Sequence, residues 1–216
     1  MQNLQPLAGI VAPSVENAMR ILLRDLIAAT LILLSLSLPA LADPIHIVAL
    51  GDSATSGWLV PSGEAYPAQL QRMLRAKGYD VIVKNAGAPG DTSAAALKRL
   101  DLAADPDTDI VIVELGTNDL RAHVPRAKME ANIGEIVRTL QKRRIAVLLI
   151  GLGSLDLSGL AGTLNVPYAQ WRLPPRRYRA RDGAHFNAEG YRILLTRTLP
   201  QIETLIRGRQ RPKNGM

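Results

Sequence analysis

Four short runs made up mainly of apolar residues mark the chain, and each is followed directly by a glycine or a polar residue. They are rich in β-branched residues and cover Ile45–Leu50, Val81–Val83, Ile110–Val113 and Ile145–Ile150. Strands that are buried on both faces need uninterrupted apolar runs rather than strict alternation. The pattern therefore predicts strands of a parallel sheet.

The segments between these runs have the periodicity of helices. Apolar residues recur three to four positions apart within residues 68–76, 92–102 and 128–142, and again from Ala188 onwards, where Pro200 predicts a kink. Strands and helices thus alternate along the chain. This order predicts one α/β domain, with helices on both faces of a mostly parallel sheet of four to five strands.

Polar blocks lie where such a sheet would place a ligand, beyond the carboxyl ends of its strands. Three blocks follow predicted strands and a fourth precedes the last helix. They are Gly51–Gly57, Asn85–Thr92, Gly116–Asp119 and Asp182–Asn187. We expect these four blocks to converge at one edge of the sheet.

The residue types in the blocks suit nucleophilic catalysis. The hydroxyl of Ser53 becomes a good nucleophile only if a base takes its proton, and His185 is the side chain suited to that task. Asp182 is three positions from His185, so it can hold the imidazole in one tautomer and stabilise its developing charge. We predict a catalytic triad of Ser53, His185 and Asp182.

Attack on an acyl carbon moves negative charge onto the carbonyl oxygen, which then needs hydrogen-bond donors. The backbone N–H groups of Ser53 and Gly87 and the side-chain amide of Asn118 are candidates for this oxyanion hole. Glycine at position 87 would let the backbone approach the substrate closely.

Each residue also has a structural explanation when it is considered alone. Ser53 could cap a helix, Asn118 could form an Asx-turn and His185 could be a structural histidine. We interpret Asp52 and Asp119 as structural residues that fix their loops. The order and placement of all four blocks together favour the hydrolase.

The blocks GDSATSG, NAGAPGDTS, VELGTND and D-x-x-H resemble the SGNH (GDSL) hydrolases, and most of all their thioesterase I, lysophospholipase and arylesterase branch. The resemblance covers residues 45–196. It implies a flavodoxin-like, three-layer α/β/α fold with a five-stranded parallel sheet, and ester or thioester hydrolysis without metal or cofactor. It implies the same triad, with Gly87 and Asn118 as oxyanion donors.

One segment departs from this branch. Only 31 residues, Gly151 to Arg181, separate the fourth predicted strand from Asp182. We expect a short fifth strand at residues 164–168 and a helix that is lost or reduced. Five arginines at residues 172–181 form either a solvated loop or a site for an anionic group, for which Arg176 and Arg177 are the candidates.

The amino-acid composition excludes several classes of protein. With 47% hydrophobic and 21% charged residues, the chain is neither disordered nor a polytopic membrane protein. The absence of cysteine excludes disulfide scaffolds, Cys-based zinc sites and cysteine nucleophiles. With three histidines, we predict no metal and no cofactor. The net charge of +7 does not by itself select a partner, and we predict no nucleic-acid partner.

The N-terminal segment has the pattern of an export signal. Arg20 and Arg24 precede thirteen uncharged residues at 26–38, and Pro39-Ala-Leu-Ala follows. Thirteen residues are fewer than the ~20 that a membrane-spanning helix needs. We predict a signal peptide over residues 1–42, with Met19 as an alternative start, and one domain over residues 43–216 with a basic tail from about residue 207. An uncleaved membrane anchor is the main alternative.

These observations predict a periplasmic or secreted serine esterase or thioesterase. Its substrates would be small ester or acyl compounds, including anionic or lipid ones. An acetyl esterase that acts on glycan or peptidoglycan is the first alternative. A non-catalytic domain that binds carbohydrate or lipid is the second. The sequence does not determine acyl chain length or oligomeric state.

Overall fold

The structure, a computed structural model, describes residues 17, 19–20, 22–27 and 43–210. The chain divides into two units, residues 1–42 and residues 43–216. The described residues of the first unit are helical, and most of the expected export signal lies outside the described residues, as does the end of the expected basic tail. Among the helices described, none has the length and apolar character needed to cross a membrane.

The second unit is built on a five-stranded sheet in which all pairs are parallel, in the order β2-β1-β3-β4-β5. The strands are β1 (Ile45–Gly51), β2 (Val81–Gly87), β3 (Ile110–Glu114), β4 (Ala146–Leu152) and β5 (Tyr168–Trp171). In this register Gly51, at the carboxyl end of β1, lies beside Gly87 of β2 and Glu114 of β3. The predicted parallel sheet is confirmed, with five strands.

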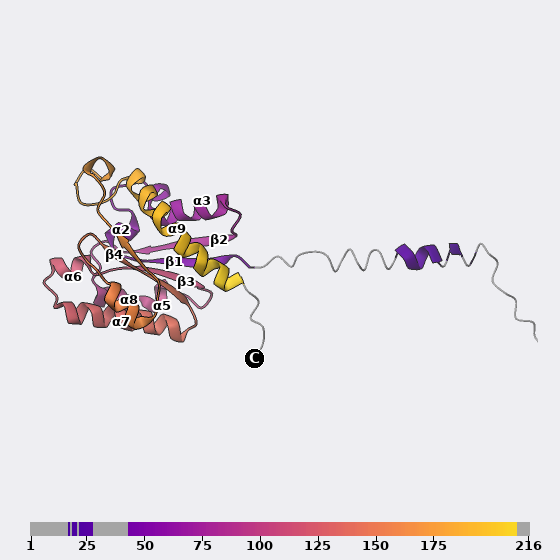
Figure 1. Cartoon of the computed structure of the whole chain (residues 1–216), viewed down its shortest axis with the longest axis horizontal. Helices are drawn as coiled ribbons and strands as arrows, with labels where there is room; N and C mark the ends of the chain where they lie inside the picture. The colour runs from indigo at the N-terminus through magenta and orange to yellow at the C-terminus, as the bar shows by residue number, and fades with distance from the viewer. Residues whose placement is uncertain (1–16, 18, 21, 28–42, 211–216) are drawn as a thin grey trace, which may run out of the picture. The chain divides into compact units, whose positions relative to one another are not determined.

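Helices cover both faces of this sheet, as Figure 1 shows for α3 and α9 on one side and α7 and α8 on the other. The α-helices are α2 (Ser53–Ser56), α3 (Tyr66–Ala76), α4 (Ser93–Lys98), α5 (Leu100–Ala103), α6 (Thr117–Arg121), α7 (Arg126–Lys142), α8 (Ser158–Leu164) and α9 (Ala188–Gln210). Two 3-10 turns, η1 (Ser62–Glu64) and η2 (Arg176–Tyr178), complete the unit. The three-layer α/β/α fold is therefore confirmed.

Strand β3 shows how the two faces are filled. Its side chains alternate between the two cores, with Ile110 and Ile112 on the side of α3 and α9, and Val111 and Val113 on the side of α7. All four are completely buried. Burial of each such side chain contributes roughly 1.5–3 kcal/mol, so an apolar run without alternation is what this central strand requires.

The fifth strand was predicted at the wrong residues. It covers Tyr168–Trp171, whereas Leu164 ends α8 and is buried against the α7 side of the sheet. Asn165 then takes a left-handed backbone conformation, with φ of 52°, and ends the helix. The helix of this segment, which was expected to be lost or reduced, is the seven-residue α8.

Two helix predictions also need correction. The helix expected over residues 92–102 is divided into α4 and α5 at Arg99. Its guanidinium bonds to the Asp91 carboxylate and to the carbonyls of Gly51 and Ala86, so it ties this region to the sheet. Helix α9 continues through Pro200 to Gln210, so residue 207 lies within the helix rather than at the start of a tail.

Candidate active site

Ser53 lies where β1 passes into the short helix α2. The Asp52 carboxylate caps this helix by accepting a hydrogen bond from the Ala54 N–H at 2.9 Å, and Ser53 is its first residue. On the α9 side, the Tyr191 hydroxyl donates to the Ala54 carbonyl at 2.8 Å. A side chain at Gly51 would meet Thr55 Oγ1 at 2.0 Å, so glycine is required where α2 folds back over the strand.

A short turn before α9 carries the histidine. Asp182 Oδ1 accepts hydrogen bonds from the backbone N–H groups of Ala184, at 3.0 Å, and His185, at 3.1 Å. The next residue, Phe186, is buried, and its ring packs edge-on against Trp171 with centroids 6.4 Å apart. The turn is therefore fixed both by its own hydrogen bonds and by an aromatic anchor.

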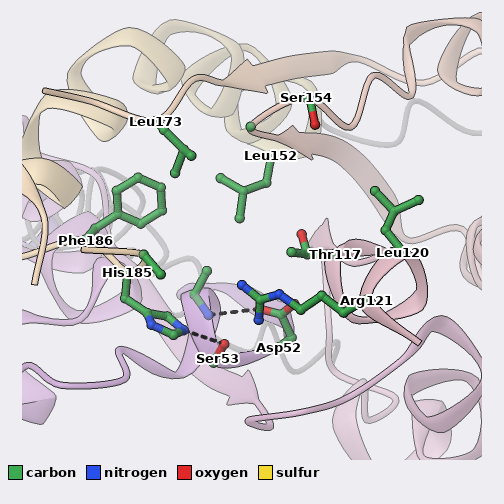
Figure 2. A pocket seen from close by; sticks show the side chains of 13 residues that line it. Asp52, Ser53, Thr117, Leu120, Arg121, Leu152, Ser154, Leu173, His185 and Phe186 are labelled. Carbon is green, nitrogen blue, oxygen red and sulfur yellow. Dashed lines mark hydrogen bonds between the residues drawn. The ribbon is translucent and has the colours of Figure 1, made fainter. Parts of the chain in front are cut away.

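The structure brings the three predicted triad side chains together. His185 Nδ1 lies 2.6 Å from Asp182 Oδ2, and His185 Nε2 lies 2.8 Å from Ser53 Oγ (Figure 2 draws the second contact). The hydrogen bond with His185 is the main cause that lowers the pKa of Asp182 to about 2. Asp182 is thus ionised at neutral pH and oriented toward the imidazole.

Two of the predicted oxyanion donors are backbone groups at adjacent strand ends. The Ser53 N–H has no acceptor among the described residues, whereas the Gly87 N–H donates to Asn85 Oδ1 at 3.0 Å. The structure gives glycine at position 87 a further reason beside the expected close approach of the substrate. A Cβ there would lie 2.2 Å from the backbone nitrogen of Ser56, so α2 itself leaves no room for a side chain.

The third predicted donor, the Asn118 amide, connects two loops. Its Nδ2 donates to Asp52 Oδ2 at 3.1 Å and to the Asp91 carbonyl at 2.9 Å. Both of its N–H groups thus have protein acceptors in this structure. The amide holds the Asp52 carboxylate, which in turn caps the helix of Ser53.

The carboxyl group of Glu114 is buried at the end of β3, beside Gly51 of β1. No role for this residue was predicted from the sequence. Burial, followed by the charge of Asp52, raises the pKa of Glu114 well above its usual range. Burial also raises the pKa of Asp52. The hydrogen bond from the Ala54 N–H and the charge of Arg121 lower this pKa, but by less than burial raises it. Both carboxyl groups are thus harder to ionise than usual, and Glu114, which is completely buried, more so than Asp52. The sequence does contain a sign of this buried acid, because Glu114 is an acidic residue directly after four apolar residues of the same strand.

The pocket above Ser53 has a volume of about 290 Å³ and lies beyond the carboxyl ends of β1, β3, β4 and β5. Figure 2 shows Ser53 and His185 at one side, with Leu152, Leu173 and Phe186 forming an apolar wall. Leu120, Arg121 and Thr117 line it from α6. The five arginines of residues 172–181 are not among the lining residues, so Arg176 and Arg177 lie outside the pocket.

Within the described residues, no three His, Asp or Glu side chains are grouped so that they could hold a metal ion.

Comparison with known proteins defines the class. Residues 49–193, more than half of the chain, match the GDSL-like lipase/acylhydrolase family. The chain therefore belongs to this family, which confirms the resemblance carried by the four blocks.

Individual relatives agree with this assignment. Esterase TesA of Pseudomonas aeruginosa is 35% identical over 129 residues, which are 59% of this chain and 63% of the relative. An arylesterase of Vibrio mimicus is 30% identical over 105 residues, which are 48% of this chain and 52% of the relative. The matched regions thus span less than two thirds of either relative.

Solved structures match over more of their length. The crystal structure of AlinE4, an SGNH-hydrolase family esterase, is 29% identical with a TM-score of 0.60, covering 76% of this chain and 98% of AlinE4. A crystal structure of TesA is 25% identical with a TM-score of 0.66, covering 74% of this chain and 99% of TesA. The lipase/acylhydrolase of Enterococcus faecalis is 26% identical with a TM-score of 0.65, covering 79% of this chain and all of that protein.

Proposed function

We propose that this chain is a serine hydrolase that cleaves carboxylic ester or thioester bonds through an acyl-enzyme on Ser53. The observation that carries the proposal is the 2.8 Å contact between Ser53 Oγ and His185 Nε2 at an apolar pocket. The names of its relatives, which include esterases and an arylesterase, support the same reaction type.

The geometry supports a two-stage reaction. As Ser53 Oγ attacks the acyl carbon, His185 Nε2 takes the hydroxyl proton, and the ionised Asp182 stabilises the imidazolium. The carbon–oxygen or carbon–sulfur bond of the ester then breaks, and His185 gives its proton to the leaving alcohol or thiol. Water attacks the acyl-enzyme next, with His185 again taking a proton. As the bond between the acyl carbon and Ser53 Oγ breaks, His185 gives this proton to Oγ, so the acid is released and the free Ser53 hydroxyl is restored.

Charge on the carbonyl oxygen would be stabilised by Ser53 N–H, Gly87 N–H and the Asn118 amide. Ser53 N–H has no acceptor within the described part of the chain, while Gly87 already donates to Asn85, and Asn118 to Asp52 and Asp91. Their participation therefore requires that these bonds lengthen or are shared when the substrate is bound.

The pocket favours an acyl chain over an acetylated glycan. Its wall of Leu152, Leu173 and Phe186 offers apolar contacts, and a sugar would need polar partners there. The acetyl esterase and the non-catalytic binding domain remain alternatives that substrate assays distinguish.

Export of this enzyme is also part of the proposal. The charged start, the apolar stretch at residues 26–38 and the small residues before Asp43 support a signal peptide that is removed after Ala42. The mass of the secreted protein tests this. An N-terminus at Asp43 would support it, and a full-length protein that remains with the membrane would indicate the anchor instead.

Hydrolysis of p-nitrophenyl esters of increasing chain length tests the activity. We expect the parent protein to hydrolyse them and Ser53→Ala to lose at least about 10³-fold in kcat. Ser62→Ala is a matched control, because Ser62 is exposed and does not line the pocket. Equal activity of Ser53→Ala and the parent would refute the mechanism.

A further inference from the structure

The pocket combines an apolar wall with one fixed positive charge. Among the described residues that line it, Arg121 is the one side chain that is a permanent cation, and it lies on α6, across from Leu152 and Leu173 (Figure 2). A purely apolar ester offers this charge no partner. Arg121 is therefore the feature of the pocket that hydrolysis of a neutral ester leaves unused.

Within the described part of the chain, Arg121 makes no ion pair. Its polar contact is a hydrogen bond to Asn118 Oδ1 at 3.5 Å, which is at the outer limit for such a bond. Arg99, in contrast, lies 2.6 Å from the Asp91 carboxylate. A guanidinium has five N–H donors, so most of those on Arg121 remain available for a ligand.

The position of Arg121 is fixed by the residues that precede it. Asp119 is completely buried and accepts hydrogen bonds from the backbone N–H of Ser93, at 2.7 Å, and from its hydroxyl, at 2.6 Å. This anchor holds the five-residue helix α6, and with it the backbone of Arg121, against the rest of the site. The charge of Arg121 acts on the catalytic region. It lowers the pKa of Asp52, the residue next to Ser53, although burial has the larger effect and raises that pKa.

We propose that Arg121 binds a carboxylate or phosphate group of the substrate, so that the site selects esters that combine an apolar part with an anionic group. This inference rests on the proposed esterase function and assigns its substrate class. Arginine suits the role because its planar fork pairs with both kinds of oxyanion. The anion would therefore bind at α6 and not at Arg176 and Arg177, which lie outside the pocket.

Two matched substrate pairs test the proposal and locate the anion. On the acyl side, p-nitrophenyl pentanoate is compared with mono-p-nitrophenyl glutarate, whose chain has the same length but ends in a carboxylate. On the alcohol side, phenyl acetate is compared with p-acetoxybenzoate. Each variant is compared with the parent on the same substrate, so differences in intrinsic reactivity cancel.

We expect Arg121→Gln to lower kcat/KM about tenfold for the anionic member of at least one pair, with little change for the neutral member. Arg121→Lys should keep part of the preference, and added salt should reduce it in the parent. Arg138→Gln removes the same charge from the exposed face of α7, and should leave the preference unchanged. The double variant Arg176→Ser, Arg177→Ser should also leave the preference for anionic esters unchanged.

Other results would overturn the inference. Equal losses for neutral and anionic esters in Arg121→Gln would show that Arg121 serves the reaction centre or offsets the charge of Asp52. An unchanged preference would show that it does not contact the substrate. If Arg121→Gln did not fold, the absence of any salt-sensitive preference in the parent would refute the proposal. Failure of the parent to hydrolyse any of the four esters, neutral or anionic, would instead refute the proposed function itself.

Discussion

His185 Nε2 lies 2.8 Å from Ser53 Oγ, although 132 positions separate the two residues in the chain. Two buried aromatic residues hold the segments that make this contact. Tyr191 bonds to the helix that carries Ser53, and Phe186 anchors the turn that carries His185. The rings of Phe186 and Tyr191 lie 5.3 Å apart, so both anchors belong to the same aromatic cluster. The core thereby determines the spacing of the reacting groups.

Asp182→Asn should lower kcat by a factor on the order of 10²–10⁴. Asparagine can keep the Oδ1 contacts of the turn, but its amide would favour the tautomer of His185 in which Nε2 carries a proton. That nitrogen could not then accept the proton of Ser53. The kcat of Asp182→Asn is compared with that of Asp107→Asn, an exposed position outside the pocket, which should behave as the parent does.

The pKa of Asp182, about 2, adds a prediction on pH. The stability that its ionised form contributes is present above the unfolded-state pKa of about 3.9 and is lost as the pH falls through about 2. Protonation of Asp182 therefore does not reduce the rate above about pH 4. An acid-side loss of activity near neutral pH that disappeared in Asp182→Asn would contradict this.

Asn118→Ala should lower kcat roughly 10²–10³-fold if the amide stabilises the oxyanion. The same substitution removes its bonds to Asp52 and Asp91, so we also expect a fall in the free energy of unfolding of about 1–3 kcal/mol. Kinetics below the melting transition separate the two effects. A folded variant with the kcat of the parent would limit Asn118 to a structural role.

Glu114→Gln tests the buried acid. Folded Glu114 holds its proton above the pH at which the unfolded residue loses it, so the parent should lose stability as the pH rises from about 5. One such proton gives a slope of up to ~1.4 kcal/mol per pH unit. Glutamine has nothing to release, so urea unfolding between pH 5 and 8 should show a shallower decline. Exposed Glu135→Gln is the control, and equal slopes in the parent and Glu114→Gln would argue against a protonated Glu114.

Gly87→Ala should destabilise the fold by about 2 kcal/mol or more, because the new Cβ would lie 2.2 Å from the backbone nitrogen of Ser56. At Gly63 a Cβ has no atom within 4 Å, so Gly63→Ala should change the free energy of unfolding by less than about 0.5 kcal/mol. Thermal unfolding of the two variants measures the difference. Equal stability would show that α2 can shift away from the strand.

The sequence predicted the parts of this structure that depend on local pattern. Apolar runs located strands β1 to β4, and polar residues at strand ends indicated where Ser53 would lie. The fifth strand was misplaced because Leu164 is apolar and buried in either a strand or a helix, and periodicity over so short a segment does not distinguish them. Long-range packing decided between the two.

The features that the sequence did not predict depend on three-dimensional neighbours. Arg121 follows Asn118 by three residues, but its place in the pocket depends on the anchoring of Asp119 by Ser93 on another helix. The close contact between position 87 and α2, which excludes a side chain there, is likewise not contained in any local pattern. The arginines near Arg176 are conspicuous in the sequence but lie outside the pocket.

Covalent labelling of Ser53 tests the central claim most directly. Diethyl p-nitrophenyl phosphate should release p-nitrophenolate and leave one diethylphosphoryl group on the protein, and peptide mapping by mass spectrometry should locate it on Ser53. Activity should be lost in proportion to labelling, and Ser53→Ala should remain unlabelled. A label on another residue, or full activity after Ser53 has been modified, would contradict the account.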